Sequence, residues 1–486
     1  MASHRRTTPS IGSRSAMETC YLSAQQLRRL YETRDLSPVE VVNAQLARIE
    51  ALDPGLNAFV TVSAEQALHQ AAAAERAFAA AEDAPALAGI PFTLKDLTAT
   101  AGIRTTRGSL LYADWIPDYD APLAQRLLAA GGILLGKTNT PELGWKGDSG
   151  NRVNGPTHNP WKHGRTAGGS SGGAAASVAL GMGVMAQGTD GAGSIRIPSG
   201  FCGTFGHKPS WGLVPQYPAS VVPLLSHAGP ITRTVRDAAL FMDVTVGPDP
   251  LDSFSLPASL PASDGAKTTF VDALQGDIAG LRIAWSPDLG SAAVDPEVSK
   301  VAAAAARRFE ELGCYVEEAH PPLDDPWEIV HTIWSTGFAG AYRDRLDEVR
   351  EQMDPGLVQV IEAGLQFSAA DLAAAYLRRD AYFHGWRTFL QNYDVMLTPT
   401  LPITAFEAGL DHPGQIQGQS TTYLSWTAFT YPFNLTGQPV ASVPCGFVDG
   451  LPVGLQIIGR WRDDPTVLRV AAAFEALAPW PHPPEA

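Results

Sequence analysis

Apolar residues recur every three or four positions in several stretches of the chain, which is typical of amphipathic helices. The stretch at 23–52 predicts two helices, because Ser37 and Pro38 mark a second helix start within it. Further helices are predicted at 64–81, up to about residue 130, in the first part of 298–319, over most of 327–393 and at 466–477. Short apolar runs predict buried strands at 87–94, 133–135, 184–186, 281–285, 395–397, 440–444 and 453–458. This mixture of helices and strands predicts an α/β fold.

Two serine-containing loops lie in glycine-rich sequence near the middle of the chain. Ser170 and Ser171 belong to the run GGSSGG at 168–173, where glycine allows the backbone to turn sharply. Ser194 ends the run DGAGS at 190–194, whose small residues can direct consecutive backbone N–H groups toward one point. Such a group of donors is what an oxyanion requires. The alanine-rich sequence between the loops predicts a buried helix and then a buried strand, so the two loops could meet in space.

Composition narrows the choice of partner. The 486 residues carry a formal net charge of −15, which argues against a nucleic-acid surface and favours neutral or apolar small molecules. No run of eighteen apolar residues occurs, so no membrane span is predicted. Residues 1–16 are basic and lack an apolar core, and we expect a disordered tail there. The four cysteines are widely spaced, which favours a reducing cytoplasm and argues against zinc: Cys20, Cys202, Cys314 and Cys445.

Three separated motifs make the chain resemble the amidase signature family: GIPFTLKDL at 89–97, GGSSGG at 168–173 and DGAGSIRIPSGFCG at 190–203. Ser170 and Ser194 are 24 residues apart, which also fits the family pattern. Further similarity continues at 207–215, 229–240, 397–402, 434–446 and 450–459. The resemblance implies one large α/β/α domain at 17–486, with a mixed central β-sheet covered by helices. Its catalytic core would span about 85–245 and 393–460, and about 327–393 would form a helical cover over the substrate entrance.

The resemblance implies amide hydrolysis by a serine, with no cofactor and no metal. Ser194 would be the nucleophile, Ser170 would pass its proton onward, and Lys95 would be the terminal base. A hydroxyl can fill the middle role because it both donates and accepts a hydrogen bond. The oxyanion hole would consist of backbone N–H groups from Ser194 and the three residues before it, Gly191, Ala192 and Gly193. Many family members have glycine where this chain has Ala192, a change that leaves the N–H in place.

Lys95 must be uncharged to act as a base. The ordinary pKa of a lysine is about 10.4, whereas catalytic lysines are tuned to about 7–8. Burial lowers a lysine pKa, and the neighbouring Phe92 and Leu94 predict such burial. We therefore expect activity to fall at acidic pH. Asp190 and Arg196 flank the nucleophile and are expected to fix its loop through hydrogen bonds, and Asp96 to do the same beside Lys95.

Four residues are candidates for substrate contacts. By alignment of KTNTPELGW with family members, Gly144 and Trp145 would lie near the acyl side. Trp211 follows the turn at 208–209, and Ser171 neighbours the proposed shuttle. An apolar or aromatic acyl group or amine is predicted.

Other motifs in the chain suggest different chemistry. Residues 131–138, GGILLGKT, fit a phosphate-binding P-loop, but a helix precedes them and apolar residues fill the loop. Residues 169–173 fit the nucleophile elbow of α/β-hydrolases, but the strand that the elbow needs is not predicted before them. Cys202 is interpreted as an inert core residue. Because of this sequence context, we predict neither a phosphate-binding loop at 131–138 nor a nucleophile elbow at 169–173.

Several alternatives stay open at the level of function. The substrate could be a carbamate or aryl ester instead of an amide, since the chemistry of attack is alike. The chain could instead be an assembly subunit resembling the A chain of glutamyl-tRNA amidotransferase, or a non-catalytic binding module. The expected partners are a small-molecule amide or carbamate and water, with no nucleic acid and no membrane, and the expected state is a monomer or homodimer.

Overall fold

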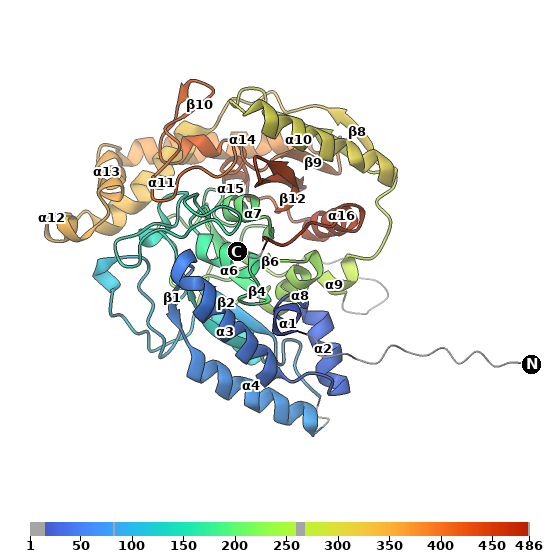
Figure 1. Cartoon of the computed structure of the whole chain (residues 1–486). Helices are drawn as coiled ribbons and strands as arrows, with labels where there is room; N and C mark the ends of the chain where they lie inside the picture. Colours follow the sequence, from blue (N-terminus) through green and yellow to red (C-terminus); the bar gives the residue numbers. More distant parts are fainter. Residues whose placement is uncertain (1–14, 81–82, 259–267, 485–486) are drawn as a thin grey trace, which may run out of the picture.

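A computed structural model describes residues 15–80, 83–258 and 268–484 (Figure 1). Most of the predicted N-terminal tail, residues 1–14, lies outside the described residues. Ser15 and Ala16, which we expected in the tail, instead begin a short helix. Ser15 caps it by accepting a hydrogen bond from the Glu18 backbone N–H.

An eleven-stranded mixed β-sheet forms the centre of the molecule, which confirms the predicted α/β fold. Strand β2 is parallel to β3 and β4, and β7 is parallel to β8 and β9, whereas the remaining pairs are antiparallel. The strands in spatial order are β1 (Phe59–Val62), β3 (Ile133–Thr138), β2 (Pro91–Lys95), β4 (Met185–Asp190), β6 (His227–Thr232), β5 (Phe205–Lys208), β12 (Val440–Val448), β13 (Leu451–Gly459), β9 (Val395–Pro399), β7 (Arg282–Trp285) and β8 (Tyr315–Glu318). A small hairpin, β10 (Gln415–Ile416) and β11 (Gln419–Ser420), is separate from it.

Helices surround the sheet (Figure 1). They are α1 (Ala16–Cys20), α2 (Ala24–Thr33), α3 (Pro38–Leu56), α4 (Ala64–Ala79), α5 (Pro122–Ala129), α6 (Gly172–Ala179), α7 (Arg196–Cys202), α8 (Val235–Thr245), α9 (Phe270–Ala273), α10 (Pro296–Arg307), α11 (Trp327–Tyr342), α12 (Leu346–Val349), α13 (Pro355–Gly364), α14 (Ala369–Phe389), α15 (Pro432–Thr436) and α16 (Asp464–Leu477). Ser23 and Ser37 cap α2 and α3 by accepting from backbone N–H groups three residues on, and Ser37 lies where the sequence predicted a helix start.

Alternate side chains of the central strands enter different apolar clusters. In β3, Leu134 packs into a cluster that includes residues of α5, α8 and α16, whereas Ile133 and Leu135 pack with residues of α3, α4 and α6. This alternation is the period of two expected of a strand covered on both faces. Because β3 runs from Ile133 to Thr138, the P-loop pattern at 131–138 is an ordinary buried strand.

The strand predicted at 87–94 is shifted. Residues 87–89 form turns, where Gly89 has a φ of 75°, and β2 begins only at Pro91. The strand then continues one residue further than expected, to Lys95. Lys95 therefore lies at the carboxyl end of β2, beside the parallel strand β4, with Leu94 paired to Gln187. Parallel neighbours bring their carboxyl ends to one edge of the sheet, which is where functional groups gather in α/β folds.

Helices α11 to α14 lie together at the side of the molecule opposite α2 and α4 (Figure 1). They include most of the residues of an apolar cluster around Ile333, Phe338, Leu357 and Ile361. Within 15–80, 83–258 and 268–484, no helix is both long and apolar enough to cross a membrane.

Candidate active site

Lys95 is fully buried and meets three hydroxyl groups. Its Nζ lies 2.6 Å from Ser170 Oγ, 2.9 Å from Ser171 Oγ and 2.9 Å from Thr189 Oγ1. None of its surface is exposed. The sheet brings these groups together because β2 ends with Lys95 and the adjacent β4 contains Thr189, while the GGSSGG loop packs on both.

Glycine is needed in the GGSSGG loop because the backbone comes very close to its neighbours. A Cβ on Gly169 would lie 2.7 Å from the Asp148 backbone, and one on Gly173 would lie 2.4 Å from the Ala58 carbonyl oxygen. Ser149 fastens the loop, since its Oγ donates to the Gly168 carbonyl and accepts from the Gly172 N–H, each at 2.8 Å. The hydroxyls of this loop are therefore held at fixed positions beside Lys95.

Burial lowers the pKa of Lys95 well below its ordinary value, and the nearby Asp190 carboxylate only partly opposes this. Asp190 is itself committed to Arg196. The Arg196 Nε and Nη2 donate to the two carboxylate oxygens of Asp190, each at 3.0 Å. Burial alone would raise the pKa of Asp190, but the Arg196 guanidinium holds it well below its usual range. The lysine thus lies near a carboxylate whose charge is already neutralised.

The same carboxylate shapes the turn between β4 and α7. Asp190 Oδ1 accepts the Gly193 N–H at 2.7 Å, and Asp190 Oδ2 accepts the Ile195 N–H at 3.1 Å. Together with the Arg196 pair, these bonds confirm the prediction that Asp190 and Arg196 fix the loop. Asp96 has a related role one strand away: its Oδ2 accepts from the Thr106 N–H at 3.0 Å and thereby fixes the segment that follows β2.

One of the four predicted oxyanion donors is already occupied. The Gly193 N–H points to Asp190 because the carboxylate closes the turn, so it is not free for a ligand. Among the described residues, the N–H groups of Gly191, Ala192 and Ser194 have no hydrogen-bond acceptor. Three backbone donors in and next to this turn are therefore available.

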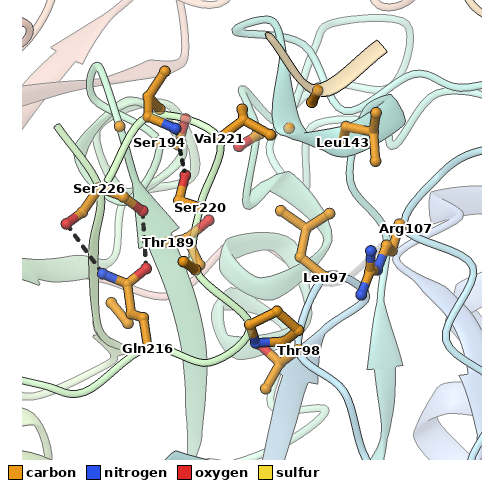
Figure 2. A pocket seen from close by; sticks show the side chains of 18 of the residues that line it. Leu97, Thr98, Arg107, Leu143, Thr189, Ser194, Gln216, Ser220, Val221 and Ser226 are labelled. Atoms are coloured by element: carbon orange, nitrogen blue, oxygen red, sulfur yellow. Dashed lines mark hydrogen bonds between the residues drawn. The ribbon is translucent and has the colours of Figure 1, made fainter. Parts of the chain in front are cut away.

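Ser194 and Ser170 line the same cavity, which has a volume of about 350 Å³. Ser194 is 7% exposed, and its hydroxyl makes no hydrogen bond within the described part of the chain. On one wall, Ser226 Oγ donates to Gln216 Oε1 at 2.8 Å, and Gln216 Nε2 donates to the Ser226 carbonyl at 3.0 Å (Figure 2). The apolar part of the lining includes Leu97, Leu123, Leu143, Val221, Val222, Trp334 and Phe338.

The residues predicted to contact substrate fall in different places. Gly144 lines the cavity, and a Cβ there would lie 3.2 Å from Ser170 Oγ. Ser171 lies behind Ser170, against Lys95. Trp145 is 1% exposed and packs near Tyr423, and Trp211 donates its Nε1–H to the Pro223 carbonyl at 3.0 Å. Neither tryptophan is among the residues that line this cavity.

Thr189 was missed by sequence reasoning, although it contacts Lys95 Nζ and lines the cavity. The available signal was its position, because it directly precedes Asp190, three residues after the strand predicted at 184–186. Arg107 was also missed. It lines the cavity and follows Thr106, the hydrogen-bond partner of Asp96.

Comparisons with known proteins agree with this geometry. The model of the amidase family matches residues 40–468, and the chain belongs to that family. An acylamidase from Rhodococcus erythropolis is 44% identical over 467 residues, which cover 95% of this chain and 96% of the relative. The A-type subunit of the glutamyl-tRNA(Gln) amidotransferase of Moorella thermoacetica is 37% identical, with 94% of this chain and 97% of the relative covered.

Solved structures give the same result. A bacterial aryl acylamidase of the amidase signature family superposes with a TM-score of 0.87 at 34% identity, covering 95% of this chain and 97% of the other. A 6-aminohexanoate cyclic dimer hydrolase superposes with a TM-score of 0.84 at 28% identity, covering 95% and 98%. The protein is therefore an amidase signature enzyme that hydrolyses amide C–N bonds.

Proposed function

We propose that the enzyme cleaves a small amide through an acyl-Ser194 intermediate, with Ser170 as the proton shuttle and Lys95 as the base. The observation that supports this most directly is the fully buried Lys95 Nζ, 2.6 Å from Ser170 Oγ, in a site where Ser170 and Ser194 line one cavity. A serine needs such help because its hydroxyl is a weak nucleophile at neutral pH.

The proton route follows from the donors and acceptors around the amine. A neutral amine has two N–H groups and one lone pair. Ser171 and Thr189 accept the two N–H bonds, and the lone pair accepts the Ser170 hydroxyl proton. Ser170 Oγ then accepts the proton of Ser194 as Ser194 Oγ bonds to the carbonyl carbon. Catalytic hydrogen bonds often tighten only when substrate is bound, so the Ser194 to Ser170 contact would form at that stage.

The remaining steps use the same groups. The carbonyl oxygen becomes an oxyanion, and the free N–H groups of Gly191, Ala192 and Ser194 would stabilise it. The protonated Lys95 returns its proton through Ser170 to the leaving nitrogen as the C–N bond breaks. Water then attacks the acyl-Ser194 ester and gives a proton to Lys95 by the same route. The bond between the acyl carbon and Ser194 Oγ breaks, Lys95 returns the proton through Ser170 to Ser194 Oγ, and the acid is released.

An apolar or aromatic substrate suits the cavity wall. Val222 and Trp334 lie beside Gly191, and Leu97 lies beside Gly144. Leu143 and Phe338 add further apolar surface to the lining. Apolar linings with a few polar groups are usual for small-molecule sites. Gly144 would lie beside the reacting atoms because it adjoins Ser170 Oγ.

The test is hydrolysis of a chromogenic acyl 4-nitroanilide by the purified chain. We expect Ser194→Ala, Ser170→Ala and Lys95→Ala each to lower kcat/KM by roughly 10³-fold or more, since such groups act as a unit. Ser177→Ala is the matched control, because Ser177 is buried in α6 and, among the described residues, its hydroxyl bonds only to the Ala174 carbonyl. Retention of most activity in Ser194→Ala would rule out the acyl-Ser194 intermediate.

A second candidate function is that of an A-type amidotransferase chain, favoured by the 37% identity to such a protein. The same assay separates the two. An amidase works as a purified chain, whereas a member of an amidotransferase assembly is expected to hydrolyse glutamine in a way that depends on added partner proteins. Robust turnover of a simple anilide by the chain alone would favour the amidase.

A further inference from the structure

Arg107 brings a positive charge to the wall of the cavity described above. Figure 2 shows it on the side away from Ser194 and Gln216, next to Leu97 and Leu143. The proposed reaction makes no use of this side chain, because the oxyanion lies at the backbone N–H groups near Ser194.

The guanidinium of Arg107 has no protein acceptor among the described residues. It lies over two aromatic rings, 4.9 Å from the Tyr112 centroid and 4.5 Å from the Trp115 centroid. Its Nε is buried without a hydrogen-bond partner, and within the described part of the chain no side-chain N–H of Arg107 donates to an acceptor. By contrast, Arg126 donates to several carbonyl groups and pairs with Asp249. Leaving a buried donor without an acceptor costs free energy, so the unused N–H groups of an arginine beside a cavity favour a ligand that supplies the acceptor.

The cavity is also cationic, although the whole chain has a net charge of −15. Its described lining contains two arginines, Arg107 and the exposed Arg345, and neither Asp nor Glu. Neither arginine forms an ion pair within 15–80, 83–258 and 268–484. The low dielectric of a walled cavity strengthens the attraction of such charges for an anion.

The backbone holds Arg107 at a fixed position relative to the proposed catalytic groups. Its N–H donates to the Asp96 carbonyl at 2.9 Å, next to Lys95, and its carbonyl accepts the Leu143 N–H at 2.8 Å, next to Gly144. The residue has a φ of 55°, a left-handed conformation that non-glycine residues adopt infrequently. The backbone of Arg107 is thus hydrogen-bonded both to the neighbour of Lys95 and to the neighbour of Gly144.

We propose that Arg107 is an anion subsite and that the preferred amide substrates carry a carboxylate on the arm that points away from Ser194. A carboxylate matches the fork of guanidinium N–H donors, and the two rings keep the fork in one orientation. The apolar walls would then bind the spacer between the amide and the carboxylate. This inference deepens the proposed function and rests on it.

The experiment compares two matched pairs of amides in the full-length enzyme. The first pair has the charge on the acyl side, glutaryl against hexanoyl 4-nitroanilide, and the second has it on the amine side, 4-acetamidobenzoate against 4-methylacetanilide. In one pair we expect the acid to exceed its neutral partner at least tenfold in kcat/KM. Arg107→Gln should lower that ratio at least tenfold, mainly through KM, and Arg107→Lys should restore part of it.

Arg343→Gln is the matched control, because Arg343 is 66% exposed at its side chain and is not among the residues lining the cavity. It should leave the ratio unchanged. A ratio near one in both pairs, or a ratio that Arg107→Gln does not alter, would overturn the subsite.

The subsite can fail separately from the proposed function. If none of the four amides is hydrolysed, the proposed function fails, and binding then tests the subsite alone. Glutaric acid monoanilide and 4-acetamidobenzoate are titrated calorimetrically into Ser194→Ala protein. Binding of either that is lost in Ser194→Ala/Arg107→Gln supports the subsite, and no Arg107-dependent binding of either overturns it.

Discussion

At Lys95, three hydroxyls surround a fully buried amine whose pKa is lowered by that burial. A protonated lysine would have to donate to all three, Ser170, Ser171 and Thr189, whereas a neutral one donates to two and accepts from the third. The shortest of the three distances, 2.6 Å to Ser170, joins the amine to the hydroxyl that also lines the cavity. The shortest contact therefore lies on the proposed route of the proton from the cavity to the amine.

The lowered pKa of Lys95 predicts an acid limb in the pH profile of kcat/KM. Activity should be constant where the amine is neutral and should fall about tenfold per pH unit once pH drops below its pKa, because the protonated amine cannot accept a proton. The limb should lie well below the ordinary lysine value of about 10.4. Far-ultraviolet circular dichroism across the same range separates this loss from unfolding. A profile that stays flat into strongly acidic pH would exclude the neutral lysine.

Thr189 should position Lys95 through the second N–H bond. Thr189→Val keeps the shape but leaves that N–H without an acceptor, and we expect kcat to fall about tenfold, in line with the worth of one buried hydrogen bond. The acid limb of the pH profile should also shift, which a purely structural role would not cause. Thr189→Ser restores the hydroxyl and should restore kcat. Unchanged kcat and pH profile in Thr189→Val would remove Thr189 from this role.

Sequence reasoning reached the lysine and the two serines because each lies in a recognisable motif. It did not reach Thr189 or Arg107, because what places them in the site is pairing and packing between distant segments. It also counted the Gly193 N–H as free, since a run of small residues does not reveal which donors its own aspartate takes. Trp145 and Trp211 stood out as aromatics, but the packing that turns them away from the cavity is not visible in the sequence.

At the scale of elements, the turn from β4 to α7 has to hold its backbone donors still. Thr430 Oγ1 donates to the Ala192 carbonyl at 2.6 Å, and Arg196 Nη1 donates to the Thr430 carbonyl at 2.9 Å. Gly193 has a φ of 131°, and a Cβ there would lie 2.4 Å from Thr430 Oγ1. Thr430, which is distant in the sequence, thus holds the turn in place through hydrogen bonds and close packing.

Gly193→Ala should therefore shift the turn and move its backbone N–H groups away from the positions where they would bind the oxyanion. We expect kcat to fall about 10²-fold, the scale of losing an oxyanion donor, and the free energy of unfolding to fall by about 1–3 kcal/mol from crowding and strain. Steady-state kinetics and urea unfolding measure the two effects. Gly340→Ala is the control: it lies in α11 with open space around a Cβ, and should stabilise by about 0.5–1 kcal/mol. Wild-type kcat in Gly193→Ala would show that the turn tolerates the extra carbon.

Most elements were predictable because their signals are local. The serine caps of α2 and α3, and the glycine after 308–312 with its φ of 75°, each mark an end that depends on neighbouring residues alone. The start of β2 was not predictable, because residues 87–90 are as apolar as a strand but are buried without belonging to one, with Gly89 packed against Tyr31 and Pro38. Burial of that surface, rather than strand pairing, explains the apolar run.

At the scale of the whole molecule, the order of the strands was beyond the reach of the sequence. β12 and β13 occur late in the chain but lie between β5 and β9, so they join the earlier strands of the sheet to β9, β7 and β8. The two ends of the described chain also meet: the rings of Tyr21 and His482 stack at 4.3 Å, and Trp480 Nε1 donates to the Arg233 carbonyl at 2.9 Å. Such contacts depend on all the intervening elements being in place.

Helix α16 is joined to α8 at this meeting point through a carboxyl group. Glu475 Oε2 accepts the Val235 N–H at 3.1 Å. Burial raises the pKa of Glu475 to about 7, and the neighbouring Asp237 carboxylate adds to the rise. Asp237 in turn accepts the Ala24 N–H at 3.0 Å and lies near Arg233. Two carboxyls and one guanidinium thus hold the N-terminal helices, α8 and α16 together.

Because the folded pKa of Glu475 is raised, its contribution to stability is fully present below about pH 4.5 and is lost as pH rises through about 7. Glu475→Gln keeps an acceptor for the Val235 N–H without the charge. We expect the variant to exceed wild type in free energy of unfolding by on the order of 1–2 kcal/mol at pH 8 and by much less at pH 5. Urea unfolding at both pH values measures this, with Glu311→Gln, 55% exposed at its side chain, as control. Equal differences at the two pH values would mean that Glu475 does not titrate with folding, and that the contact between α16 and α8 depends on packing alone.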